Sequence, residues 1–196
     1  MSIAEKLITI AENEQRVFEA GKNTERDEFW EDFQFGGIET NYNYALCGER
    51  WTDKTYNPKY PIVAKQMVSC FMNSRITDTK VPISFTSGSN MMFSGCRSLK
   101  TIRSLTPLVE NFSWINCFNN CPALENITFE GIIDGTDISF STCTKLTHDS
   151  LMNILGHLKN VSGTGISRTL TLGATNLAKL TDTEKVSATQ KGWTLA

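Results

Sequence analysis

The sequence lacks most of the features by which membrane proteins, nucleic-acid binders and many enzymes are recognised. It has only two histidines, and no apolar run approaches the ~20 residues that cross a bilayer. Its 19 basic and 21 acidic residues leave a formal charge of -2, without the basic excess typical of a nucleic-acid binder. We therefore predict partners that are neither membranes nor nucleic acids.

The first residues show no secretory signal, which bears on the state of the cysteines. The stretch from Met1 to Glu14 carries charges every few residues and has no apolar core of the kind found in signal peptides. Thiols stay reduced in the cytosol. We therefore expect the six cysteines to be reduced and buried as small core residues.

The centre of the chain contains a repeat in which phenylalanine is followed at regular intervals by cysteine, leucine and isoleucine. Copies begin at Phe93, Phe118 and Phe140, and a weaker copy at Phe71 has serine in the cysteine position. The phenylalanines are 22, 25 and 22 residues apart, within the ~20–29 residue period of leucine-rich repeats. We predict that successive turns stack around a shared interior. Its predicted core residues are Phe71, Phe93, Cys96, Leu99, Ile102, Phe118, Cys121, Leu124, Ile127, Phe140, Cys143 and Leu146.

The pattern predicts an α+β fold: a short leucine-rich-repeat solenoid with an N-terminal helix and a cap of helices and a strand. Short strands are expected at residues 83–85, 127–129 and 138–140, where apolar and polar residues alternate. The predicted segments are a helical segment at 1–37, an aromatic-rich junction at 38–66, repeats at 67–149 and the cap at 150–196.

In the cap we expect a helix that starts near Thr147 or Asp149, followed by a strand at residues 169–172. A second helix should begin at the capping box of Thr181 and Glu184 and end near Gly192. Such a cap covers core that the last turn would otherwise expose.

Two features before the repeats each have two interpretations. The N-terminal helix could cover the end of the solenoid, or it could form a coiled coil that makes a homo-oligomer or docks onto another protein. The junction aromatics could pack that helix against the first turn, or they could form an exposed patch that binds a glycan or a protein. These candidate binding residues are Tyr42, Tyr44, Trp51, Tyr56 and Tyr60.

We predict no catalytic residue, no metal site and no cofactor. Cys117 and Cys121 could form half of a zinc site, but a second pair at suitable spacing is missing. A cysteine nucleophile would need His148 or His157 within hydrogen-bond reach. A glycosidase would need two acids on either side of a cleft. The candidates for that pair are Glu125, Glu130, Asp134 and Asp137.

At its repeats the sequence resembles the BspA-like class of bacterial leucine-rich repeats. The stretches that carry the likeness are 92–102 and 117–127, although the isoleucine-proline segment usual between copies is missing. Nearly the whole chain is similar to leucine-rich-repeat proteins encoded among tail and structural genes of phages and prophages of Gram-positive gut bacteria. This second likeness rests on residues 4–14, 51–60, 74–77, 172–180 and 191–195.

The resemblance implies a non-catalytic tail- or baseplate-associated protein with a structural or host-binding role. Its partners would be other phage tail proteins and a protein or cell-surface glycan of the host. It would lie in the host cytoplasm during assembly and then in the virion. A tail-associated glycan hydrolase and a cytosolic anti-host factor that binds a bacterial protein stay open as alternatives.

Overall fold

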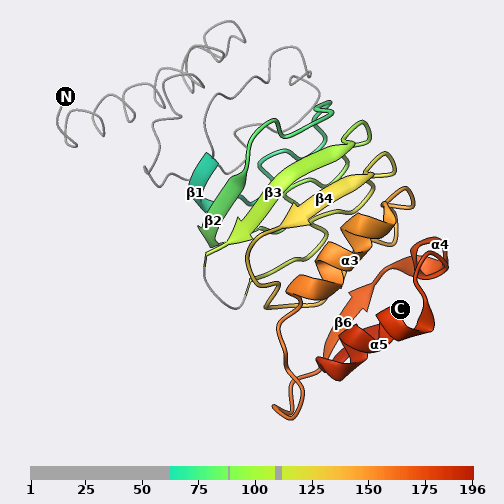
Figure 1. The fold of residues 1–196 in the computed structure, drawn as a ribbon. Helices are drawn as coiled ribbons and strands as arrows, with labels where there is room; N and C mark the ends of the chain where they lie inside the picture. The colour runs from blue at the N-terminus through green and yellow to red at the C-terminus, as the bar shows by residue number, and fades with distance from the viewer. Residues whose placement is uncertain (1–61, 88, 109–111) are drawn as a thin grey trace, which may run out of the picture.

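The computed structural model describes residues 62–87, 89–108 and 112–196, without the side chains of residues 62–66, 86 and 87. The expected N-terminal helical segment and all five aromatic residues singled out in the junction lie outside these ranges. Within them the chain forms a mixed α/β arrangement of stacked turns (Figure 1).

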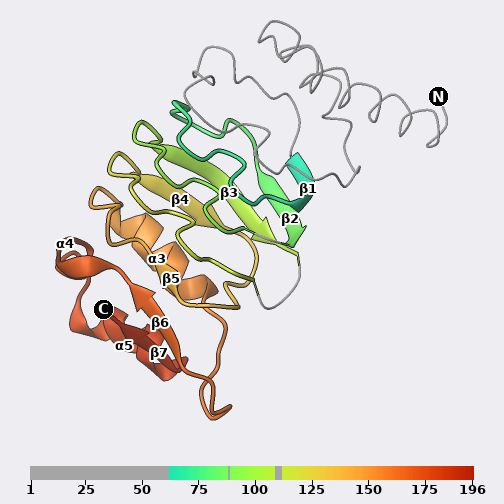
Figure 2. The ribbon, with the colours of Figure 1, turned by 180° about the vertical axis from the view of Figure 1, so that it is seen from behind.

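Two small parallel sheets run through the described part of the chain. The larger has the strand order β1 (Ile62–Gln66), β2 (Ile83–Ser87), β3 (Thr101–Pro107) and β4 (Asn126–Phe129). The smaller, seen from behind in Figure 2, has the order β5 (Ile138–Ser139), β6 (Arg168–Thr171) and β7 (Trp193–Leu195). Within each sheet every strand is parallel to the one before it, so the connections carry the chain once around per turn.

Three helices follow the larger sheet: α3 (His148–His157), α4 (Gly173–Leu177) and α5 (Asp182–Gln190). The hydroxyls of Thr147 and Thr181 cap α3 and α5. The capping box of Thr181 and Glu184 that the sequence predicts is present in full. None of these described helices is long and apolar enough to span a bilayer.

Hydrogen bonds join equivalent positions of successive turns. The N–H of Phe71 donates to the carbonyl of Met92, and the N–H of Phe93 donates to the carbonyl of Cys117, both at 2.9 Å. Other N–H groups of the same bends donate within their own turn, as Met92 does to the carbonyl of Ser89 at 3.1 Å. Bonds of both kinds satisfy backbone groups in the tight bends around the phenylalanines.

The four repeat phenylalanines form one continuous stack in the core. Ring centroids are 5.1 Å apart for Phe71 and Phe93, 6.0 Å for Phe93 and Phe118, and 4.5 Å for Phe118 and Phe140. The planes of neighbouring rings differ by 9–21°. The expected cysteines, leucines and isoleucines are buried beside them, each at most 1% exposed. One face of every turn is therefore buried only because its neighbours cover it.

The repeat cysteines act as hydrogen-bond donors inside this core. Each thiol donates to the carbonyl of the phenylalanine one turn earlier, at 2.9, 3.0 and 3.4 Å: Cys96 to Phe71, Cys121 to Phe93 and Cys143 to Phe118. In the next turn the side-chain amide of Asn176 is the donor in place of a thiol. It donates to the carbonyls of Phe140 at 3.4 Å and Cys143 at 3.1 Å. Cysteine suits this position because it is small, apolar and still a weak donor.

In the bend around each of the first three repeat phenylalanines, two residues adopt the left-handed backbone conformation. Two residues after phenylalanine lie Asn73, Gly95 and Asn120, and two residues before it lie Ser69, Met91 and Asn116, all with φ between 53° and 75°. Asparagine and glycine adopt this region most readily. The need for it explains why asparagine or glycine comes directly before the cysteine or serine of these three copies.

Met91 is the residue least suited to its backbone angle, φ 54°. We predict that Met91→Asn, which copies Asn116 of the next turn, raises the free energy of unfolding by about 0.5–1 kcal/mol because the asparagine side chain tolerates this region. Urea denaturation of the two proteins measures the difference. A loss of stability would show that packing of the half-buried methionine outweighs the backbone term.

A helix rather than a further strand ends the larger sheet. The hydroxyl of Ser150 accepts from the N–H of Ile127 at 3.1 Å. The side chain of Asn153 accepts from the N–H of Phe129 at 2.7 Å and donates to its carbonyl at 3.4 Å. Two polar side chains of α3 thus satisfy the edge of β4, which would otherwise be open to another strand.

The structure adds strands and a helix that the sequence pattern did not indicate. The expected strands at 83–85 and 127–129 lie within β2 and β4. The expected strands at 138–140 and 169–172 correspond to β5 and β6, whose ends differ from the prediction by at most one residue. β1, β3, β7 and α4 were not expected. In β3 the alternation is broken, because the register shifts between Ile102 and Leu105 and Ser104 is buried as well. β5 and β6 lie on either side of the predicted boundary at residue 149, yet they pair.

Candidate binding surface

Polar side chains, most of them short, lie on the outward face of β3 and β4 and of the residues aligned with them. Ile102, Ile127 and Phe129 point into the core, so the alternate residues of β3 and β4 face outward. The strand register aligns these residues with outward-facing residues beside them, giving eight residues in three rows. We name these eight the outer sheet face: Asp78, Thr101 and Asn126; Arg103 and Thr128; Ser84, Thr106 and Glu130.

Arg103 is the one long cation on the outer sheet face, and it is held in place. Its guanidinium donates to both carboxylate oxygens of Asp78, with Nε–Oδ1 at 3.0 Å and Nη2–Oδ2 at 2.6 Å. Its backbone N–H donates to the hydroxyl of Thr79 at 3.0 Å. The side chain of Arg103 is still 54% exposed. A fixed, exposed guanidinium loses little conformational entropy when it binds a partner.

Two exposed aliphatic residues lie where β3 and β4 leave the outer sheet face. Leu108 is 49% exposed and Ile132 is 55% exposed. Gly131 lies against Pro107, where a Cβ would come within 2.7 Å of the Pro107 carbonyl, so the ends of β3 and β4 approach closely just before these two residues. Taken as a whole, a non-obligate protein interface is about as polar as the rest of the surface, so the polar character of this face is compatible with protein binding.

Burial opposes ionisation of the thiols in the repeat core. Burial is the main cause that raises the pKa of the Cys117 thiol. The pKa of Cys121 is raised first by its hydrogen bond with Cys143 and then by burial. Both groups are therefore protonated at neutral pH, whereas a nucleophile or zinc ligand needs the thiolate. Within the described ranges, no group of three or more cysteine, histidine or acidic residues could hold a metal.

Both histidines have partners other than cysteine. Nε2 of His148 lies 2.9 Å from the carboxylate of Glu184 and links the first turns of α3 and α5. Nδ1 of His157 lies 2.8 Å from the carbonyl of Asn153, and the ring is half-buried rather than fully solvated. The pKa of Glu184 is lowered mainly by the backbone N–H of Thr181, then by the Thr181 hydroxyl and His148.

The four acidic residues considered for hydrolysis do not converge on a cleft. Glu125 precedes β4 and Glu130 follows it, so the strand separates them by about 16 Å at 3.3 Å per residue. The buried carboxylate of Asp134 binds the Lys159 ammonium at 2.9 Å. Asp137 accepts from the backbone N–H of Thr169 at 2.7 Å. Two of the four carboxylates thus have structural partners, and the other two are at opposite ends of a strand.

The outer sheet face was missed in the sequence because its residues are short and individually ordinary. Aligning β3 with β4 in the sequence would have indicated this face, because polar residues flank the buried residues at the same positions in both strands. The junction aromatics, which were the predicted binding residues, lie outside the described residues.

Comparison with known proteins gives one finding. No match was found among curated proteins, and none was found among solved structures. A family model described as "BspA type Leucine rich repeat region (6 copies)" matches residues 67–181, which is more than half of the chain. The matched range begins just after β1 and ends at the N-cap of α5, so it includes the stacked phenylalanines and the helices α3 and α4. The chain belongs to the BspA-type leucine-rich-repeat family.

Proposed function

We propose that this chain is a non-catalytic module whose stacked turns form a short solenoid and whose outer sheet face binds a protein partner. Leucine-rich-repeat domains have protein-binding or structural roles. The single observation that carries the proposal is a fixed, exposed arginine among polar side chains, on a sheet face that ends in the exposed residues Leu108 and Ile132. An exposed apolar pair beside a rigid polar surface favours association with another protein.

We further propose that the partner belongs to a phage particle and that the chain is a tail- or baseplate-associated component. The support is the similarity of nearly the whole sequence to leucine-rich-repeat proteins encoded among phage tail and structural genes. In this proposal residues 1–37 provide attachment, and the protein passes from the host cytoplasm into the virion. A host protein or cell-surface glycan is then the target of the assembled particle.

The first experiment asks where the protein is found. Particles purified from the source culture are analysed by mass spectrometry and chemical cross-linking, beside the host lysate. We expect the chain in the particles, with cross-links from the outer sheet face to another particle protein. Presence only in the lysate, bound to a host protein, would favour the anti-host alternative.

The second experiment tests the surface itself. Leu108→Lys with Ile132→Lys is expected to reduce incorporation into particles at least about tenfold, because each buried aliphatic side chain contributes about 1.5–3 kcal/mol and 1.4 kcal/mol corresponds to about tenfold. Ile166→Lys, at a site that is 46% exposed in a distant turn, is the matched control and should have no effect. Equal incorporation of all three proteins would refute this surface.

The hydrolase alternative has its own test. The combined change of Glu125, Glu130, Asp134 and Asp137 to amides is assayed for release of soluble sugar from host cell walls. Turnover by the wild type that this variant loses would contradict the non-catalytic proposal. Glu125→Gln and Glu130→Gln alone, which leave the buried Asp134–Lys159 pair intact, separate lost chemistry from lost folding.

A further inference from the structure

β7 is the last strand of the smaller sheet, and its outer side is unpaired. The N–H of Ala196 donates to the carbonyl of Leu170 at 3.1 Å, and its carbonyl accepts from the N–H of Leu172 at 2.6 Å. In a parallel ladder, alternate residues of a strand make both bonds to the same neighbour. Thr194 therefore also faces β6, and the N–H and C=O of Leu195 face away from it. Neither group has a hydrogen-bond partner within the described ranges.

This edge differs from the edge of the larger sheet, which the chain closes. At β4, the side chains of Ser150 and Asn153 take up the free backbone groups. At β7, no side chain of the described residues bonds to the outer edge. An edge left without such protection is a template for another strand.

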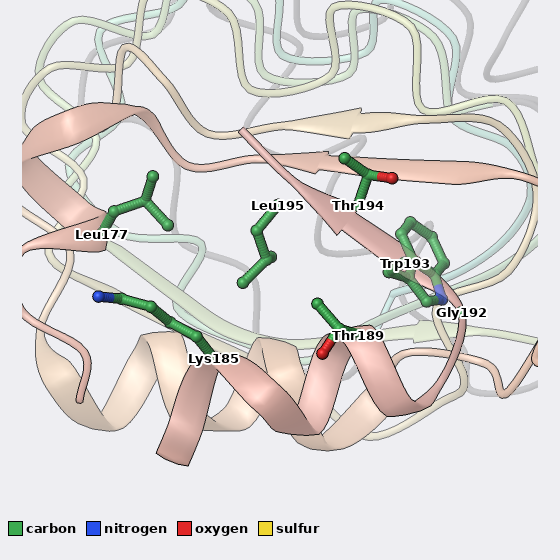
Figure 3. A pocket seen from close by; sticks show the side chains of 7 residues that line it. All are labelled: Leu177, Lys185, Thr189, Gly192, Trp193, Thr194 and Leu195. Carbon is green, nitrogen blue, oxygen red and sulfur yellow. The ribbon is translucent and has the colours of Figure 1, made fainter. Parts of the chain in front are cut away.

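An open cavity of about 670 Å³ adjoins the unpaired edge, between β7 and α5. Figure 3 shows Leu195 directed from β7 toward α5, with Lys185 and Thr189 extending from α5 and Leu177 from α4. Trp193, which is 2% exposed, closes one end. Leu177 and Leu195 are partly buried and pack against the core. The cavity is within the ~300–1,000 Å³ range of ligand pockets and has mainly apolar walls with one cation.

The cavity and the edge occupy the place that a following turn would fill. In this sheet β6 covers the edge of β5, and β7 covers the edge of β6, always in parallel register. Each added strand also brings a large apolar side chain into the core, as Leu170 and Trp193 do. A strand added to β7 with an apolar side chain in the cavity would repeat the interface that already joins the turns.

We propose that this end of the stacked turns, formed by β7, α5 and the cavity between them, binds an extended segment of a partner polypeptide by strand addition. Main-chain bonds to Leu195 hold the segment, and the cavity selects one large apolar side chain. Lys185 lies at the cavity, and its bond to Asp182 at 3.2 Å is exposed and easily exchanged. The preferred segment therefore carries an acidic residue close to its apolar one. This site is separate from the outer sheet face.

The test uses the isotope-labelled full chain and a synthetic seven-residue peptide in which threonine alternates with leucine or phenylalanine and a glutamate comes last. Amide hydrogen exchange is followed by NMR during titration. We expect saturable binding and, at saturation, exchange at Leu195 slowed at least about tenfold, which is about 1.4 kcal/mol. The amide of Thr194, already bonded to β6, should change much less.

Three matched changes identify the contacts. Methylation of alternate backbone nitrogens in the peptide removes its donors and should weaken binding at least about tenfold. Thr189→Trp fills the cavity from an exposed helix position and should weaken binding to a similar degree while leaving the amide spectrum of the repeats unchanged. Lys185→Glu should reverse the preference from a glutamate-ended to a lysine-ended peptide.

Three results would overturn the proposal. The first is an absence of binding at millimolar peptide concentration. The second is binding that leaves Leu195 exchange unchanged, which would indicate a small amphiphile site and not strand addition. The third is protection of Leu195 without peptide together with self-association in sedimentation, which would identify a second copy of this chain as the occupant.

Discussion

Replacing Phe118 by alanine is expected to lower the free energy of unfolding by about 3–5 kcal/mol. The ring lies between Phe93 and Phe140, 6.0 and 4.5 Å from their centroids, and meets Phe129 edge-on. Its removal leaves a cavity in the middle of the stack, and neither flanking ring can move in without leaving its own turn. Chemical denaturation followed by circular dichroism measures the loss.

Ile115→Ala is the control for this prediction, because Ile115 belongs to the same turn but is 53% exposed. Its effect should be within about 0.5 kcal/mol. A loss for Phe118→Ala no larger than for Ile115→Ala would mean that the phenylalanine stack does not stabilise the fold.

The second large effect is expected for Gly135→Ala, at about 2–6 kcal/mol. Gly135 has φ 110°, a region that costs other residues about 1–3 kcal/mol. A Cβ at this position would lie 1.8 Å from the carbonyl oxygen of Phe112, so the backbone must move. Overpacking of this kind costs about another 1–3 kcal/mol. Among the glycines between β4 and β5, Gly135 should therefore tolerate substitution least.

Gly163→Ala separates the two causes. Gly163 also has positive φ, 76°, but a Cβ there would meet nothing within 4 Å. We expect only the backbone term, about 1–2 kcal/mol. Thermal or urea unfolding of the three proteins gives the comparison. Equal losses at both positions would show that contact with Phe112 is not the dominant cost.

The two predicted binding regions place different demands on a partner. The outer sheet face offers side chains, with Arg103 fixed by Asp78, and it suits a folded surface. The end at β7 offers backbone groups and one cavity, and it suits an extended segment. A protein that meets one neighbour along its side and another at its end would use both.

The repeat core could be predicted from residue types alone, because Phe93, Phe118 and Phe140 recur with cysteine and leucine at fixed intervals, and a stacked turn can bury that face only against its own copy. Much of the cap could be predicted too, since threonine and glutamate three residues apart specify a helix start wherever it occurs, as Thr181 and Glu184 do. The broken alternation of β3 concealed a strand, because its register shift depends on the neighbouring turns.

The sequence by itself determined which side chains fill the interior, because burial of apolar side chains follows from residue type in a repeating pattern. Only the tertiary structure decided which exposed groups share a surface. Arg103 meets Asp78 from the previous turn through strand register, and Leu195 and Lys185 line one cavity because α5 packs along β7. The first contact joins different turns and the second depends on how a helix packs on a strand, so no local pattern encodes them.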